Sequence, residues 1–426
     1  MRPLGGFTDT RPLRSSAAFR RLWIGTTAAA FSGQIAVVAV LSQVWDLTGS
    51  TSWTGAIGVA TAVPTIVGGM VGGTLADTLD RRRLVVATTA VSVLAALGLA
   101  LQAVAGTTSV LLVLALVAAQ TSATAVGAAA RRTFVSRLLP QDLVPAGVAL
   151  NHVGFQFAML TGPAVAGLVL TAGGPRAAYL ADAVGITVSL YGVLRLPGMR
   201  PEPLAGHDTA RTARGGPAAV RATWEGWTYL FHRPVLRGCL ATDLAATVLA
   251  MPIALFPAVN EQRFDGDEAT LGLFLSAIAV GGLTAGFASG TVTRARRTGR
   301  LMLIAATTWG VALAAFALVD SLAATLACLA VAGAADTVSV ISRGTIVQLS
   351  TPDALLGRVS AVEGVVGVAG PGLGNARAGA LASGTSVAVS SLTGGLACVL
   401  AVAVIAAATP ALRRWTQPAP TGTPAR

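Results

Sequence analysis

The chain of 426 residues contains no lysine, so all 30 of its basic residues are arginine. A phosphate-binding loop of the form G-x-x-x-x-G-K-[ST] is therefore absent, which excludes ATP binding by that route. Charged residues make up only 11% of the chain, against 54% hydrophobic residues, and the mean hydropathy is +0.70. A soluble protein of this length cannot cover so much apolar surface with so few charges. The sequence therefore predicts an integral membrane protein.

Cysteine is also scarce. The three cysteines, Cys239, Cys328 and Cys398, lie far apart within apolar runs. That spacing fits small buried residues better than disulfides or metal ligands. No catalytic, cofactor-binding or metal-binding motif is present, so we expect no enzyme activity, no cofactor and no metal.

Long apolar runs are abundant. Twelve runs of about 17 to 26 residues are each long enough to cross a hydrocarbon core of roughly 30 Å as a helix. They cover residues 22–45, 54–76, 84–105, 109–130, 146–171, 177–195, 235–259, 269–292, 300–319, 321–342, 358–382 and 387–409. The predicted fold is all-α, with 12 transmembrane helices.

The arginines gather on alternate sides of these runs. The N-terminal arm, every second connection and the C-terminal tail hold 27 of them; Arg176 and Arg263 lie on the opposite side, and Arg377 lies inside a run. By the positive-inside rule both termini are cytoplasmic, which predicts a multi-pass protein of the bacterial inner membrane. The net charge of +12 is thus a topology signal, and no nucleic-acid-binding motif accompanies it. We expect a monomer in the lipid bilayer.

An internal repeat relates the two halves of the chain at an offset of 212 residues. The segment of 37 residues that begins at Arg131 aligns without a gap with the segment that begins at Arg343, with 11 identities. A chain this rich in Ala and Gly gives roughly four by chance. The repeat predicts two pseudo-symmetric six-helix bundles of the same orientation.

The repeat and the apolar runs predict five segments. These are an N-terminal arm (1–21), a first six-helix bundle (22–196), a cytoplasmic linker (197–234), a second bundle (235–410) and a tail (411–426). In the linker, Val220, Trp224, Trp227 and Phe231 recur at helical spacing, which predicts an amphipathic helix on the membrane surface. Binding of a partner protein by that helix is the alternative.

A motif between the second and third runs combines a carboxylate with three arginines. The stretch GGTLADTLDRRRL (72–84) places Asp77 at the membrane edge, before Arg81 and Arg82. Such a cluster can bind carboxylates and helix C-termini in one state and release them in another. We expect a conformational latch; the alternative is that the arginines only anchor the topology.

A second motif lies in the fifth run. The stretch AMLTGPAVAG (158–167) combines Gly162, Pro163 and Gly167. Proline bends a helix, and small neighbours let another helix approach closely. The pattern suits a helix whose tilt changes, or alternatively a static kink.

Together the two motifs resemble the signatures of the major facilitator superfamily, although Asp80 stands where the first signature has glycine. With an acidic residue at position 80, the motif resembles that of the enterobactin-exporter-like branch of the drug:proton antiporters. Residues 139–167, 251–259 and 374–383 also resemble that branch. The resemblance implies export of a small amphipathic molecule, such as a drug, an antibiotic or a siderophore, by proton antiport with alternating access. The second motif marks antiporters in that superfamily.

Ionisable residues inside membrane spans are costly, so each is a candidate working part. We expect proton coupling at Asp243, Glu363, Asp336 and Arg377. Arg377 is expected to meet an acid on another helix, Asp243 being the first choice. Glu363 is expected to contact Arg131, Arg358 or the cluster around Asp77. We therefore count Arg131 among the expected latch residues, with Asp77, Arg81 and Arg82. Permanent structural ion pairs are the alternative.

Uncharged polar residues within the spans are candidates for a substrate cavity. They are Gln34, Gln120, Asn151 and Gln156. The expected partners are therefore a small-molecule substrate and protons. Two rival functions stay open: a sensor or assembly protein that transports nothing, and a proton-coupled importer.

Overall fold

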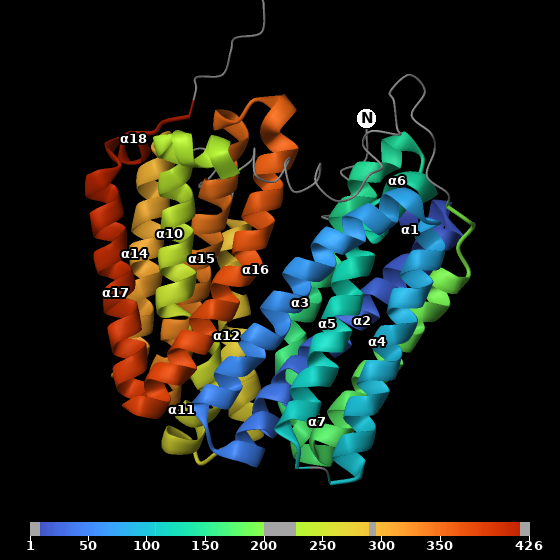
Figure 1. Ribbon diagram of the computed structural model, residues 1–426, viewed down its shortest axis with the longest axis horizontal. Helices are drawn as coiled ribbons and strands as arrows, with labels where there is room; N and C mark the ends of the chain where they lie inside the picture. The colour runs from blue at the N-terminus through green and yellow to red at the C-terminus, as the bar shows by residue number, and fades with distance from the viewer. Residues whose placement is uncertain (1–8, 107, 200–226, 289–294, 418–426) are drawn as a thin grey trace, which may run out of the picture.

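The computed structural model describes residues 9–106, 108–199, 227–288 and 295–417. Within its helices, the side chains of residues 77, 353, 354, 356–358, 360 and 361 lie outside the description. The described residues form helices and connections, with no strand among them. Figure 1 shows two helical bundles side by side, with both ends of the described chain at the same edge, here called the terminal end. The opposite edge is the outer end.

The first bundle contains the helices up to residue 194. These are α1 (Arg11–Ser15), α2 (Ala17–Thr48), α3 (Thr51–Thr78), α4 (Arg81–Val104), α5 (Val110–Arg132), α6 (Phe134–Leu138), the 3-10 turn η1 (Gln141–Leu143) and α7 (Val144–Leu194). Serine or aspartate side chains cap the starts of α2, α4 and α5 by accepting from the first free backbone N–H groups.

Helix α7 folds back on itself and supplies two passes. Gly174 has φ 65° and ψ −170°, a conformation that glycine adopts without steric cost, and Pro175 follows it. Both arms of α7 pack along α2 in opposite directions: Gly154 and Gly162 lie against Thr27 and Gln34. On the other arm, Gly185 and Gly192 lie against Ser32 and Arg21.

The second bundle repeats the pattern. Its helices are α10 (Pro234–Ala250), η2 (Ile253–Leu255), α11 (Phe256–Arg263), α12 (Glu268–Phe287), α14 (Thr298–Phe316), α15 (Leu322–Ser350), α16 (Asp353–Gly384), α17 (Val387–Ala408) and α18 (Pro410–Arg413). A break at Met251 and Pro252 divides one pass into α10 and α11, since proline cannot donate to the helical ladder.

In the described chain, ten helices are long and apolar enough to cross a membrane, with α7 counted once and α16 not included. The two arms of α7 make eleven passes. Helix α16 is the twelfth, and it contains the polar residues Glu363, Asn375 and Arg377. The all-α membrane fold is confirmed. Four predicted boundaries differ from the helices by five residues or more. Helices α2 and α16 begin at Ala17 and Asp353 instead of 22 and 358, α12 ends at Phe287 instead of 292, and α15 continues past 342 to Ser350.

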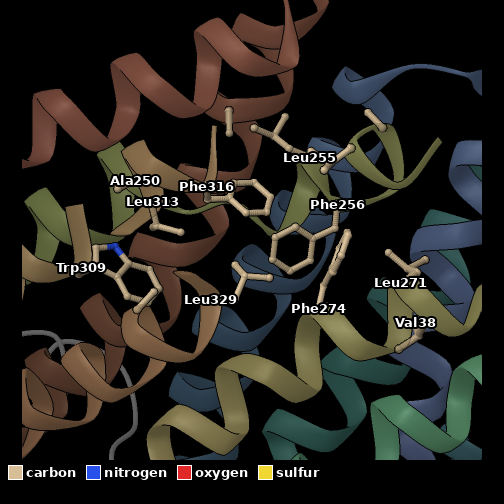
Figure 2. Close-up of a cluster of buried hydrophobic side chains, with 14 of the residues drawn as sticks. Val38, Ala250, Leu255, Phe256, Leu271, Phe274, Trp309, Leu313, Phe316 and Leu329 are labelled. Atoms are coloured by element: carbon tan, nitrogen blue, oxygen red, sulfur yellow. The ribbon is translucent and has the colours of Figure 1, made fainter. Parts of the chain in front are cut away.

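An aromatic core fills the outer end of the second bundle (Figure 2). The ring centroids of Phe256 and Phe274 lie 5.5 Å apart in an edge-to-face arrangement, and Phe316 lies 5.9 Å from Phe256. Each such pair contributes about 0.5–1.5 kcal/mol beyond its buried area. Val38 of α2 and Leu271 of α12 belong to the same buried cluster, so the core continues from one bundle into the other.

The linker between the bundles is described only at its two ends, residues 197–199 and 227–234. Residues 227–232 are helical, and the indole of Trp227 stacks on Phe231 at 5.6 Å. Leu230 is buried against Val347 and Val359 of the second bundle. Val220 and Trp224, the rest of the predicted amphipathic helix, lie outside the described residues.

Candidate functional site

A cavity of about 770 Å³ lies between the bundles. Its wall comes mostly from α2, α3, α4, α5 and the second arm of α7, and the second bundle adds Ile253, Ala254 and Asn375. Most lining side chains are small or apolar, with scattered hydroxyl groups, and its polar groups include Gln120, Arg131 and Asp182. The volume is in the range of sites for drug-sized molecules, and the few polar groups can orient a ligand.

A second cavity of about 430 Å³ adjoins the first and shares Thr26, Ala30, Ala128 and Arg131 with it. It adds Leu22, Arg132 and Asn151, among other residues near the terminal end. Together the two cavities run from the middle of the protein towards the terminal end.

The outer end is closed by contacts between the bundles. Within the described residues, four hydrogen bonds join the bundles, and all four lie there. Ser42 Oγ donates to Glu268 Oε1 at 2.5 Å, and Thr54 Oγ1 donates to Ala254 O at 2.7 Å. The other two join Thr51 to Gly379 and Ser52 to Ser383, each at 2.8 Å.

Glycines allow the backbones of α3 and α16 to touch at this closure. A Cβ atom on Gly58 would lie 2.6 Å from the carbonyl oxygen of Gly372, and one on Gly55 would lie 2.8 Å from that of Asn375. Nearer the terminal end the two helices separate: Gly364 and Gly367 of α16 have no such neighbour. Figure 1 shows α3 and α16 diverging in that direction.

The Gly–Pro motif of α7 lies at the same closure. A Cβ atom on Gly167 would lie 2.7 Å from Ala269 Cα of α12, and Gly272 of α12 packs on the carbonyl of Pro163. Gly162 packs on Gln34 of α2 instead. The small residues therefore bring α7 close to a neighbour in each bundle.

Asp182, in the second arm of α7, lines the cavity with a fully buried side chain. Ser32 Oγ donates to its Oδ1 at 3.1 Å, and Gln120 Nε2 donates to its Oδ2 at 2.7 Å. No arginine pairs with it in the described part of the chain. The sequence does not distinguish Asp182 as a site residue, because a position near the end of an apolar run is equally typical of a solvated residue.

Arg131 lies where the two cavities meet. Its guanidinium donates to Thr89 Oγ1 at 2.6 Å and to Ser189 Oγ at 3.2 Å. No described acid forms an ion pair with it, and the expected contact with Glu363 is therefore wrong. A cation held by hydroxyl groups in a cavity wall can bind an anionic or carbonyl group of a ligand.

The second bundle gathers three of the predicted ionisable residues. Arg343 of α15 forms ion pairs with Asp243 of α10 and with Glu363 of α16, the latter at 3.5 Å. The three side chains are 12–20% exposed. Asp336 lies two turns before Arg343 on the same face of α15. It is exposed and close enough to interact electrostatically with Asp243 and Arg343.

The expected pairing of Asp243 with Arg377 is wrong. Arg377 lies towards the outer end near Ser390 and Ser391, and its Nε is buried without a hydrogen-bond partner. The internal repeat contained a signal for this pairing, because Arg343 is the counterpart of Arg131 and both side chains are partly buried.

The arginines of the first motif bind helix C-termini of their own bundle. Arg82 Nη2 donates to Leu194 O, the last carbonyl of α7, at 2.6 Å, and Arg81 Nε donates to Ala76 O at 3.3 Å. Asp80 caps α4 by accepting from Arg83 N at 3.0 Å. Its other oxygen accepts from Met199 N at 3.1 Å, which explains an acid where the signature has glycine. The side chain of Asp77 lies outside the description.

Of the predicted cavity residues, Gln120 lines the larger cavity and Asn151 the smaller one. The Oδ1 atom of Asn151 is buried without a partner. Gln34 packs on Gly162, and neither it nor Gln156 is among the residues that line these two cavities.

Two six-helix bundles around a central cavity define a secondary transporter of the major facilitator type. A nucleoside transporter structure aligns over 93% of this chain and 99% of its own, with a TM-score of 0.72 at 13% identity. A D-xylose-proton symporter aligns over 94% and 99%, with a TM-score of 0.67 at 16% identity. These likenesses establish the fold.

The family follows from the sequence comparison. Residues 8–421 match the family described as transmembrane secretion effectors, so the chain belongs to that family. The enterobactin exporter of Shigella flexneri is 25% identical over 408 residues, which is 96% of this chain and 95% of the exporter. The enterobactin exporter of Escherichia coli O157:H7 matches to the same extent.

Proposed function

We propose that the protein exports a siderophore similar in kind to enterobactin across the inner membrane, in exchange for protons. The cavity carries this proposal: it extends towards the terminal end, contacts between the bundles close its outer end, and it is large enough for an amphipathic molecule. The full-length similarity to two enterobactin exporters supports the substrate class.

The orientation is part of the proposal. The arginine distribution supports a cytoplasmic terminal end, which makes the described state inward-facing. In a background without native cysteines, Gln262→Cys and Thr385→Cys are expected to react with an impermeant thiol reagent in intact cells. Ser136→Cys and Thr416→Cys are expected to react only after permeabilisation. Reaction of all four in intact cells contradicts the orientation.

The substrate is tested in a bacterial strain that lacks its own enterobactin exporter. Expression of this protein is expected to restore enterobactin in the medium, and a protonophore is expected to stop the restoration. Recovery that survives the protonophore contradicts proton antiport. No recovery contradicts the substrate. Uptake into the cells in place of export favours the rival importer.

The arginine motif is proposed to act as the conformational latch. Arg82 ties the start of α4 to the end of α7, and such a bond, made in only one state, shifts the equilibrium between states by its differential energy. Arg82→Gln is expected to reduce export at least tenfold while enterobactin still binds in detergent. Arg83→Gln, whose arginine side chain makes no hydrogen bond in the described chain, is the matched control. Equal export by both variants contradicts the latch.

The cluster around Arg343 is proposed to couple charge to conformation. Arg343 contacts acids on two other helices, so neutralising either acid leaves the guanidinium bound to the remaining one. Helix α15 then keeps an ion pair with only one of its two neighbours, α10 or α16. Asp336 adds a further negative charge beside it.

A further inference from the structure

The hydrogen bonds of Asp182 and Gln120 fix which face of Gln120 the cavity meets. Gln120 Nε2 donates to Asp182 Oδ2 at 2.7 Å. An ionised carboxylate only accepts hydrogen bonds, so the amide nitrogen must face it. The amide oxygen of Gln120 then receives no hydrogen bond from the described residues, and Gln120 lines the cavity. With Asp182 ionised, the wall at this point offers a hydrogen-bond acceptor.

A proton on Asp182 reverses that arrangement. The protonated carboxyl carries an O–H that donates, and the nearest side chain able to turn and accept it is Gln120, whose amide has an oxygen on one side and a nitrogen on the other. Rotation of the amide by half a turn brings its oxygen to Asp182 and its NH₂ group to the cavity. Ser32 keeps its bond to Oδ1, which needs no rearrangement.

We propose that Asp182 and Gln120 form a proton-operated switch in the substrate site. In the ionised state the wall accepts a hydrogen bond from a hydroxyl or ammonium group of a ligand. In the protonated state the wall presents N–H donors, so a ligand hydroxyl loses the bond that it donates and an ammonium group is repelled. Proton and ligand therefore exclude each other at one position. Such exclusion is what exchange of one for the other requires. The switch rests on the proposed function for its role in transport, but not for its existence.

Few charged groups compete with Asp182 for this role. On α2, no charged residue lies between Arg21 and Asp46. On α4, the charged residues are Arg81, Arg82 and Arg83, all at its start. On α5, Arg131 lies 11 residues from Gln120, roughly 16 Å along the axis. On α7 the titratable neighbour is Tyr179, whose hydroxyl is occupied by Gln43 Oε1 at 2.6 Å.

The second bundle provides the contrast. Asp243 and Glu363 both pair with the Arg343 guanidinium, so a cation lies beside each carboxyl group. Asp182 is held only by neutral donors in a fully buried position, where an uncompensated charge is costly. A proton, or the donor of a ligand acting through Gln120, compensates that charge.

Infrared difference spectroscopy between acidic and alkaline pH tests the switch on the purified protein without substrate. We expect a carboxylic-acid C=O band at acidic pH that Asp182→Asn removes and Asp243→Asn, the matched control, preserves. Gln120→Leu is expected to retain the band at a shifted frequency, because the protonated carboxyl loses its acceptor. If Asp182→Asn removes no band from the wild-type difference spectrum, or if Gln120→Leu leaves the Asp182 band at its wild-type frequency, the proposal is overturned.

Binding of enterobactin across the same pH range tests the link to transport. The wild-type protein is expected to bind about tenfold more weakly at acidic pH, the effect of losing one hydrogen bond to the neutral amide oxygen of Gln120. Asp182→Asn is expected to bind weakly at every pH, since its amide donates to Gln120 as the protonated acid does. If enterobactin does not bind the wild-type protein, the proposed substrate fails, and the infrared titration still decides the switch.

Discussion

Replacing Gly58 by valine is expected to abolish export and to leave the transporter open at its outer end. A Cβ atom at this position would lie 2.6 Å from Gly372 O and 3.2 Å from Gly372 Cα, both of them backbone atoms that no rotamer change can move. The bundles must therefore separate where they now touch. Overpacking of this kind costs about 1–3 kcal/mol, enough to shift a two-state equilibrium by roughly fivefold to 150-fold.

Cysteine labelling measures the shift. Ile57 lines the cavity floor behind the closure, so Ile57→Cys is expected to react from outside in the Gly58→Val background and to be protected otherwise. Gly69→Val is the matched control, because Gly69 lies on the same helix with no atom within 4 Å of its Cβ position. If Gly69→Val fails equally, the defect is one of folding. If Gly58→Val exports normally, the α3–α16 contact is not part of the transport cycle.

The sequence predicts the membrane passes well because hydrocarbon leaves the backbone no alternative to helix. Every N–H and C=O must bond within its own segment, so apolar length alone decides the element. The turn of α7 was also visible, since Gly174 and Pro175 separate two predicted runs. The break at Pro252 was not, because the apolar run continues through it to Val259.

Side-chain partners were harder to predict than helices. Asp243 meets Arg343 and not Arg377 because the two arginines occupy opposite ends of their bundle, and the sequence does not give the rotation of each helix about its axis. The depth of Asp182 depends on α2 and α5 packing over it, which supplies Ser32 and Gln120 from far along the chain. The repeat predicted equivalent positions, but not what each position contacts.

Replacing Arg343 by glutamine is expected to destabilise the second bundle and stop export. The variant leaves Asp243 and Glu363 without a cation, at 12% and 20% side-chain exposure. Breaking a buried ion pair by removing one partner costs about 3–5 kcal/mol. Thermal unfolding in detergent is expected to show a large decrease in the melting temperature, whereas Arg297→Gln, at an exposed arginine outside the cluster, is expected to show little change.

A double variant separates the two roles that the cluster can have. Arg343→Gln with Asp243→Asn removes one cation and one anion, so most of the lost stability is expected to return, and the coupling between the two sites is read from the double-mutant cycle. Export is expected to stay absent, because α15 no longer carries the arginine that forms ion pairs with α10 and α16. A stable double variant that exports normally would show that Arg343, Asp243 and Glu363 form a permanent structural cluster, and would leave charge coupling to the first bundle alone.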